Sequence, residues 1–262
     1  MANMTSSVSA SQVAGELASA TFEEIPALVE HYREDPRQQV IKACERALKR
    51  HSKEVAERER VNGMYELMHE LGGDGVVVGV DEVGRGSVAG PLTVCAVCLP
   101  MEPRVWGIND SKKLTPARRE LLSVKIAEVA TAIGFCHIAP KDIDQMGMAR
   151  AIRVAVAGAV ADTGLEPDCV LMDGNPLGAV PNERDVVKGD AKIACIAAAS
   201  IMAKVTRDEM MVEYDAEYPE YHLAESKGYA SPEHIEAIRK HGLCPLHRVS
   251  FCGNFLQTEC LF

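Results

Sequence analysis

The sequence has 262 residues, 47% of them hydrophobic, and carries a formal net charge of −10 at pH 7. This length allows one large domain or one domain with an appendage, and the hydrophobic share is ample for a sizeable core. The acidic balance argues against an indiscriminate nucleic-acid coat protein, because such proteins present a basic face. We expect no membrane span, since no uncharged apolar run reaches about 18 residues, and no secretory signal, since the N-terminus has neither a basic segment nor an apolar core.

Residues 1–21 are rich in small polar side chains, which bury too little surface to offset the entropy of ordering, so we expect this segment to be disordered. Residues 22–72 have a helical pattern and form a helical extension. Asp35-Pro36 resembles a helix start, and apolar residues follow at three- and four-residue spacing. The many charges at residues 49–60 indicate either a solvated helix face or a surface that contacts substrate.

The glycines at residues 72–75 mark a natural boundary, and residues 75–262 predict a mixed α/β layered domain with a C-terminal helical segment. We expect strands at residues 76–81, 88–99, 131–138, 169–172 and 184–187, and helices at 116–130, 148–162, 190–217 and 232–240. The first two strands should be antiparallel, because the connection between them is short.

The most informative stretch is residues 76–86, where a β-favouring run ends in the adjacent acids Asp81 and Glu82 and a glycine–arginine–glycine turn follows. Neighbouring side chains on a strand point to opposite faces, so the two acids can serve one site only if the chain bends there, and Gly84 supplies the freedom to bend. Two acids at a strand end suit a hard divalent cation such as Mg²⁺. The alternative is an acidic, solvated turn.

The cysteines are typical of a reducing compartment. They number nine, which is odd, and are scattered through apolar segments; this favours buried free thiols over a disulfide framework. We therefore expect a cytoplasmic protein. Cys95 and Cys98 have the spacing of a zinc or redox motif, but they fall within an expected strand, where residues three apart face opposite sides. We do not expect their sulfur atoms to converge.

Asp173 also ends an apolar strand. If this strand neighbours the one that ends at Asp81, both aspartates emerge at one rim of the sheet, which is where ligand sites of open α/β sheets lie. An ordinary Asp-Gly turn is the alternative for Asp173.

Asp190 precedes a long Ala-rich helix, so it can be a plain N-cap, or it can cap the helix and still offer its outer oxygen to a metal. Asp208 lies about five turns further along the same helix, at about 1.5 Å per residue. That is too far for it to share a metal with Asp190, and we interpret Asp208 as a salt-bridge partner.

Seven motifs follow one another along residues 76–251. They are Asp81-Glu82-Val83-Gly84-Arg85-Gly86, Asp110-Ser111-Lys112-Lys113-Leu114, Met172-Asp173-Gly174, Lys188-Gly189-Asp190, Ala198-Ala199-Ser200-Ile201-Met202-Ala203-Lys204-Val205-Thr206-Arg207-Asp208, Lys227-Gly228-Tyr229 and His247-Arg248-Val249-Ser250-Phe251. In this order and at this spacing they resemble ribonuclease HII, the type 2 ribonuclease H family. The sister family, ribonuclease HIII, typically carries threonine where this chain has Arg85, so that position favours HII.

The resemblance implies a ribonuclease H-like fold, in which a mixed β-sheet is flanked by helices. It assigns catalysis and metal binding to Asp81, Glu82, Asp173 and Asp190, with two divalent cations, Mn²⁺ or Mg²⁺, at the carboxylate cluster. Asp81 would lie between the two cations, with Glu82 and Asp173 on one side and Asp190 on the other. The implied reaction is endonucleolytic hydrolysis that leaves a 3′-hydroxyl and a 5′-phosphate.

The implied substrates are RNA–DNA hybrids and duplex DNA that contains embedded ribonucleotides, which would be cut on their 5′ side. We expect substrate contacts from Gly84, Arg85, Gly86, Lys112, Lys188, Ser200, Arg207 and Tyr229. The 84–86 turn can bring backbone groups close to a ribose, whose 2′-hydroxyl distinguishes RNA from DNA, and the family's tyrosine that stacks at the RNA–DNA junction maps onto Tyr229. We expect a monomer with local positive potential around the cleft.

Two alternatives stay open. A different nuclease or a recombinase can use the same fold, because fold alone does not fix function; a duplex with a single ribonucleotide would separate these. A non-catalytic binding module, whose acids are only turns and caps, would show no coupled Mn²⁺ sites in calorimetry.

Overall fold

The computed structural model describes residues 8–256. The chain divides into two compact units, Met1–Asn62 and Gly63–Phe262, and the division falls within the helix α3, Gln38–Gly72. The sequence placed the boundary later, at residues 72–75. The last turns of α3 belong to the second unit because Tyr65 is fully buried there and its hydroxyl accepts a hydrogen bond from the Val105 backbone at 2.9 Å.

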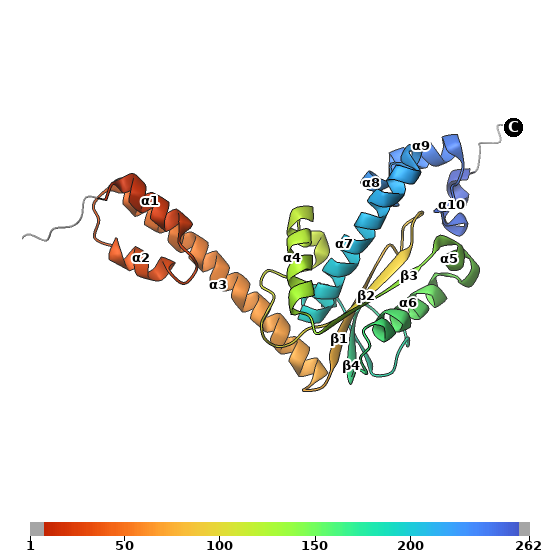
Figure 1. Cartoon of the computed structure of the whole chain (residues 1–262), viewed down its shortest axis with the longest axis horizontal. Coiled ribbons are helices and arrows are strands. Elements are labelled where there is room, and N and C mark those ends of the chain that lie inside the picture. Colours follow the sequence, from red (N-terminus) through yellow and green to blue (C-terminus); the bar gives the residue numbers. More distant parts are fainter. Residues whose placement is uncertain (1–7, 257–262) are drawn as a thin grey trace, which may run out of the picture. The chain divides into compact units, whose positions relative to one another are not determined.

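The first unit contains α1 (Ala10–Ser19), α2 (Ile25–His31) and the first turns of α3 (Figure 1). The prediction that residues 1–21 are disordered is wrong for residues 10–19. Ser9 and Gln12 form a reciprocal capping box at the start of α1, and its apolar face packs into a core with α2 and α3. Residues 1–7 lie outside the described residues.

The second unit is built on a five-stranded sheet. Its strands are β1 (Val77–Val83), β2 (Leu92–Cys98), β3 (Ala132–Ile138), β4 (Cys169–Asp173) and β5 (Glu183–Val186), in the order β3-β2-β1-β4-β5. β1, β2 and β3 pair antiparallel, whereas β1, β4 and β5 pair parallel. The predicted mixed sheet and the antiparallel pairing of the first two strands are confirmed.

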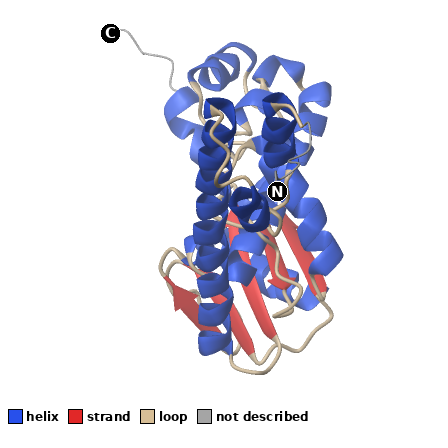
Figure 2. Ribbon diagram, turned by 90° about the vertical axis from the view of Figure 1, so that its left-hand side faces the viewer, coloured by secondary structure: helices blue, strands red, loops and turns tan. Residues whose placement is uncertain are grey.

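Helices cover both faces of this sheet (Figures 1 and 2). The helices of this unit are α4 (Pro116–Val129), α5 (Pro140–Met146), α6 (Met148–Asp162), α7 (Ala194–Glu217), α8 (Leu223–Ser226), α9 (Pro232–His241) and α10 (Val249–Leu256), of which α6 and α7 lie on the sheet itself. The apolar side chains of α6 form a core with one face of the sheet, and α7 packs against the other face along β1 and β2. Within residues 8–256, no helix is both long enough and apolar enough to cross a membrane.

Glycine and alanine allow α7 to lie very close to the sheet. A Cβ atom at Gly79 of β1 would collide with the backbone at Cys195 and Ile196, and the first turns of α7 are a buried run of mostly alanine residues. Because side chains alternate along a strand, Asp81 faces the same side as Gly79. The close approach therefore brings α7 to the face on which Asp81 lies.

Candidate active site

Asp81 and Asp173 lie at the same rim of the sheet. β1 and β4 are parallel neighbours whose register pairs Gly79 with Leu171 and Val80 with Met172. The next residue of each strand is an aspartate, so the two side chains emerge side by side at the carboxyl ends of the strands. The condition under which both aspartates emerge at one rim of the sheet, that the two strands are neighbours, is met.

Glu82 lies next to Asp81 near the end of β1, which stays paired with β2 through Val83 before the chain turns at Gly84. The Asp81 carboxylate accepts a hydrogen bond from the Glu82 backbone N–H at 2.8 Å, and both side chains line one pocket. Gly84 has a φ of +85°, a left-handed conformation that glycine adopts without strain. The predicted bend at Gly84 is therefore present.

Asp190 reaches the rim through a short turn that is tied to Asp173. The Gly189 N–H donates to the Asp173 carboxylate at 2.7 Å, and Asp190 lies in the 3₁₀ turn Gly189–Ala191, where it is buried. The prediction that Asp190 caps the following helix is wrong: α7 begins at Ala194, and Ile193 precedes it without a side-chain cap. Asp190 is held at the rim by the hydrogen bond between the preceding residue, Gly189, and Asp173, and not by a role as helix cap.

Burial and mutual repulsion dominate the electrostatics of these acids. Burial raises the pKa of Asp81 well above its ordinary value, and the neighbouring Glu82 adds to the shift, while a hydrogen bond from Ser200 opposes it. Burial also raises the pKa of Glu82, against the nearby Arg85. For Asp190, burial followed by the charge of Asp173 raises the pKa. The cluster holds more negative charge than its own surroundings neutralise.

Lys112 is the cation that responds to the whole cluster. Although partial burial lowers the pKa of Lys112, the charges of Asp81, Asp190 and other acids outweigh this and raise it. Lys112 is therefore a fixed positive charge beside the carboxylates.

The four carboxylates are not arranged as a finished metal site. Within residues 8–256, no three or more His, Cys, Asp or Glu side chains are gathered so that they could hold an ion by themselves. The donor set itself is nevertheless the one that hard divalent cations prefer: carboxylate oxygens only, with no histidine or thiolate among them. Mg²⁺ is commonly bound through one or two carboxylates, with water and substrate phosphate completing its shell. The residues therefore fit a cation that is held jointly with a phosphate.

A pocket of about 400 Å³ opens beside Asp81 and Glu82, which line it, whereas Asp173 and Asp190 lie outside its lining. Its lining includes six of the eight predicted substrate contacts, namely Gly84, Arg85, Gly86, Lys112, Ser200 and Tyr229. Ser111 and Lys204 also line it, although neither is among the predicted substrate contacts. Lys204 lies four residues after Ser200 on α7, one helical turn away on the same face, so helical spacing within that motif could have indicated it.

Ser200 connects α7 to Asp81. Its hydroxyl hydrogen bonds the Asp81 carboxylate, and its Oγ lies 2.9 Å from that of Ser111. Ser200 therefore links the Asp81 carboxyl group to Ser111. The prediction that Asp208 is a salt-bridge partner is confirmed, because its carboxylate pairs with Lys204 at 2.7 Å.

Two predicted contacts are not in the pocket. Arg207 is fully buried, and its guanidinium donates to the carbonyls of Ala89, Pro91 and Lys227. The expectation that Arg207 contacts substrate is therefore wrong, because the side chain is fully buried and each of its three guanidinium nitrogens donates to a loop carbonyl. Lys188 is exposed two residues before Asp190 and lies outside the pocket lining.

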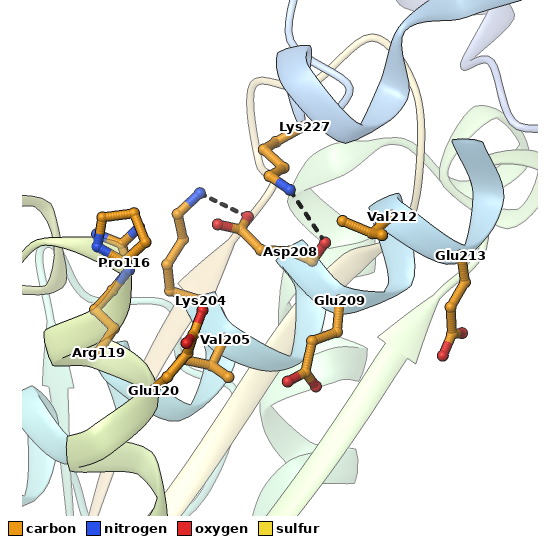
Figure 3. A pocket seen from close by; sticks show the side chains of 10 residues that line it. All are labelled: Pro116, Arg119, Glu120, Lys204, Val205, Asp208, Glu209, Val212, Glu213 and Lys227. Carbon is orange, nitrogen blue, oxygen red and sulfur yellow. Dashed lines mark hydrogen bonds and ion pairs between the residues drawn. The ribbon is translucent and has the colours of Figure 1, made fainter. Parts of the chain in front are cut away.

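A second and larger pocket, of about 570 Å³, lies between α4 and α7 (Figure 3). It shares only Lys204 with the first pocket and contains none of the four carboxylates. Lys204 and Lys227 both point toward Asp208 in this view, and each hydrogen bonds it. The two lysines that line this larger pocket are thus engaged within the protein. We therefore consider it a weaker candidate for the active site than the pocket beside Asp81.

Comparison with known proteins places this arrangement in a family. Residues 78–254 match the family model described as ribonuclease HII, and residues 9–71 match that of the ribonuclease HII N-terminal domain. A ribonuclease HII of Ruminiclostridium cellulolyticum is 42% identical over 221 residues, covering 83% of this chain and 87% of the relative. One of Moorella thermoacetica is 47% identical over 200 residues, covering 75% of this chain and 97% of the relative.

Solved structures agree with the fold. The ribonuclease H2 of Pyrococcus horikoshii superposes with a TM-score of 0.59 at 27% identity, covering 70% of this chain and 99% of that one. A Bst-RNase HIII, described in complex with Mn²⁺, superposes with a TM-score of 0.54 at 18% identity, covering 70% of this chain and 68% of that one. At that identity the second likeness shows the fold alone.

Proposed function

This chain belongs to the ribonuclease HII family and is a ribonuclease H endonuclease, and we propose that it cleaves both the RNA strand of hybrids and single ribonucleotides embedded in duplex DNA, on their 5′ side. The observation that carries this proposal is the convergence of two groups of residues on one pocket. Asp81 and Glu82 of β1 line this pocket with Arg85, Lys112 and Tyr229, which can hold phosphate and stack on a sugar or base, and Asp173 lies beside Asp81 on the neighbouring strand β4.

The donor set supports two divalent cations, Mg²⁺ or Mn²⁺, held by Asp81, Glu82, Asp173 and Asp190 together with a substrate phosphate. Bound cations of this kind activate water and neutralise charge on the reacting phosphate. Asp81 is central to the assignment because it lies between Glu82 in its own strand and Asp173 in the next. Calorimetry with Mn²⁺ on Asp81→Asn and the wild type tests whether the carboxylates form coupled cation sites.

The protein's own side chains would position the scissile phosphate. Lys112 supplies a fixed positive charge next to the carboxylates. The exposed Arg85 side chain forms an ion pair with Glu82 at 3.5 Å, and from this position its guanidinium can also contact the adjoining phosphate. Ser200 orients the Asp81 carboxylate through its hydrogen bond.

Recognition of the ribose falls to the Arg85 turn, residues 84–86, and to Tyr229. The turn has no bulky side chain at either glycine, so its backbone groups can approach a 2′-hydroxyl, which is the atom that distinguishes RNA from DNA. The Tyr229 side chain is 41% exposed although it lines the pocket, so its ring is available for stacking at an RNA–DNA junction. We propose that hydrolysis leaves a 3′-hydroxyl and a 5′-phosphate.

We further propose a cytoplasmic monomer. The cysteines in residues 8–256 are all free and five of the eight are buried, which suits a reducing compartment. Sedimentation of the purified protein at micromolar concentration tests the monomer.

One gel assay tests the activity. A duplex with one ribonucleotide and a long RNA–DNA hybrid, each labelled at either end, are incubated with Mg²⁺ or Mn²⁺. We expect cleavage of both substrates, with single-ribonucleotide products that end immediately 5′ of the ribonucleotide and can be extended by a polymerase from a 3′-hydroxyl. Cleavage of the hybrid alone would reject the single-ribonucleotide activity, and Asp81→Asn provides the inactive control.

A further inference from the structure

A chain of hydrogen bonds through two buried histidines ends at the backbone of Tyr229. His234 lies in α9 and His247 lies just before α10, and both are buried. Their Nε2 atoms are 3.1 Å apart, and Nδ1 of His234 is 2.9 Å from the carbonyl oxygen of Tyr229. At the other end, Nδ1 of His247 is 3.0 Å from the backbone nitrogen of Cys244.

Neutral rings can satisfy this chain in only one way. The Cys244 N–H only donates, so Nδ1 of His247 accepts and the proton of that ring is on Nε2. His234 accepts this proton at its own Nε2 and therefore carries its proton on Nδ1, from which it donates to the Tyr229 carbonyl. Burial lowers the pKa of both rings, that of His247 to about 4, so both are neutral at pH 7. The donor that faces Tyr229 is therefore fixed.

The Tyr229 backbone is held on both sides, while its ring stays accessible. Its N–H donates to the Ser226 carbonyl at 2.9 Å, and its carbonyl accepts from the Ser231 N–H at 2.8 Å as well as from His234. The guanidinium of Arg207 lies 5.8 Å from the centre of the ring. The backbone contacts leave little freedom except rotation of the side chain itself.

The segment that holds Tyr229 also holds the Arg85 turn, another part of the pocket lining. Arg248, the residue after His247, donates to the Arg85 carbonyl at 3.2 Å and to the Gly90 carbonyl at 2.9 Å. His247 itself forms an isolated bridge with Ala89. Two consecutive residues therefore connect the Tyr229 loop to the Arg85 turn.

We propose that His234 and His247 are positioning residues that fix Tyr229 relative to the Arg85 turn and so set the substrate preference of the pocket. This rests on the proposed function, since it is Tyr229 that is assigned to the RNA–DNA junction there. Neither histidine lines the pocket, so both act through Tyr229 and not on the substrate.

Two substitutions at one position separate positioning from general stability. His234→Asn places an amide nitrogen near the position of Nδ1 and keeps the donor to Tyr229. His234→Gln places its amide near Nε2, which keeps a partner for His247 but removes that donor. We expect the Gln variant to lose about tenfold in kcat/KM on a single-ribonucleotide duplex and much less on a long hybrid, while the Asn variant stays close to wild type. Equal losses in the two variants, or equal losses on the two substrates, would overturn the proposal.

A double substitution tests whether His234 acts through Tyr229. Adding His234→Gln to Tyr229→Ala should cause no further loss on the single-ribonucleotide duplex, because residues that act through one contact are not additive. Additive losses would show that His234 acts elsewhere.

Hydrogen exchange gives a readout that does not depend on activity. Amides of residues 226–231 should exchange faster in His234→Gln than in His234→Asn, while α7 stays protected in both.

The exchange result is independent of the proposed function. If the wild type does not cleave at single ribonucleotides, the proposed function fails, but hydrogen exchange still decides whether the histidines position Tyr229. If the Gln variant does not fold, His247→Asn keeps the acceptor for Cys244, removes the donor to His234 and should show the same faster exchange. Unchanged exchange in whichever variant folds would overturn the proposal.

Discussion

A Cβ atom on Gly79 of β1 would lie 2.3 Å from the carbonyl carbon of Cys195 in α7. The obstacle is the backbone of a buried helix, so no side-chain rotation can relieve the clash. We expect Gly79→Ala to push α7 away from β1, to lower the free energy of unfolding by about 1–3 kcal/mol and to reduce activity, because Ser200 would move away from Asp81. Urea unfolding and the cleavage assay measure the two effects.

Gly63→Ala is the matched control for this prediction. Gly63 lies inside α3, and a Cβ atom there would meet nothing within 4 Å. Alanine is favoured over glycine in a helix by about 0.5–1 kcal/mol, so this variant should be as stable as the wild type or more so. A Gly79→Ala protein with the stability of the Gly63→Ala protein would show that α7 does not need the close approach.

Asp81→Asn should abolish cleavage without weakening the fold. The carboxylate is buried against Glu82, and burial raises its pKa well above the ordinary value, so removing the charge relieves repulsion in the metal-free protein. We expect a melting temperature at or above that of the wild type and no detectable turnover at saturating Mg²⁺. Asp208→Asn, which removes only the ion pair with Lys204, should keep most of the activity. Unimpaired turnover in Asp81→Asn would refute the assignment.

Asp190→Asn tests the fourth acid. Ile193 precedes α7 without a side-chain cap, so this substitution removes no cap and the helix should persist. Activity should fall, because Asn offers a neutral oxygen where a carboxylate faces Asp173 and Lys112. Far-UV circular dichroism and cleavage with Mg²⁺ check the two parts. Full activity would mean that Asp190 has no part in binding the cation.

The strand ends were predictable from the sequence because their signals are local. An apolar run that stops at Asp81, and another that stops at Asp173, indicate two strands whose last side chains are acidic. Their adjacency could only be stated as a condition, since the pairing of β1 with β4 brings together segments about 90 residues apart. The capping box at Ser9 was also a local signal. It was overlooked because the small polar composition of residues 1–21 indicated disorder.

The errors at Asp190 and Arg207 have a different origin. In each case the partner that decides the role lies outside the local sequence pattern from which the prediction was made. The turn at Asp190 is fixed by the Gly189 hydrogen bond to Asp173, and Arg207 is buried by carbonyls from Ala89, Pro91 and Lys227. Helix propensity and the basic character of a residue carry no information about such partners.

Stability should fall as the pH drops from about 6.5 to about 4. Burial, followed by the nearby His234, lowers the pKa of His247 from 6.5 to about 4 in the folded state. Below pH 6.5 the unfolded chain therefore binds a proton that the folded chain does not, and the difference reaches about 3 kcal/mol near pH 4. Above pH 6.5 both states are neutral and this group contributes no slope.

Urea unfolding at pH 7.5, 6 and 5 measures this slope. His247→Gln cannot titrate, so it should flatten the pH dependence while the carboxylates contribute equally in both proteins. A slope identical to that of the wild type would show that His247 does not resist protonation in the folded state.

The last prediction concerns the first unit. Its arginines are largely engaged inside the unit: Arg58 pairs with Glu54 and Glu23, and Arg50 donates to the carbonyls at the end of α1. Phosphate contacts require cations that can exchange their counterions for the nucleic acid. We therefore expect that deleting residues 1–62 changes the salt dependence of the Michaelis constant little.

A deletion of residues 1–72 makes the necessary comparison. It also removes Tyr65, whose hydroxyl accepts the Val105 N–H in the second unit, so we expect it to unfold at a lower temperature than the 1–62 deletion. The Michaelis constant of both truncated proteins at two salt concentrations, with their melting temperatures, separates the two roles of the segment. The opposite result would be a 1–62 deletion that keeps its melting temperature but whose Michaelis constant loses much of its salt dependence. It would show that the first unit contacts phosphates, although its arginines are paired within the unit.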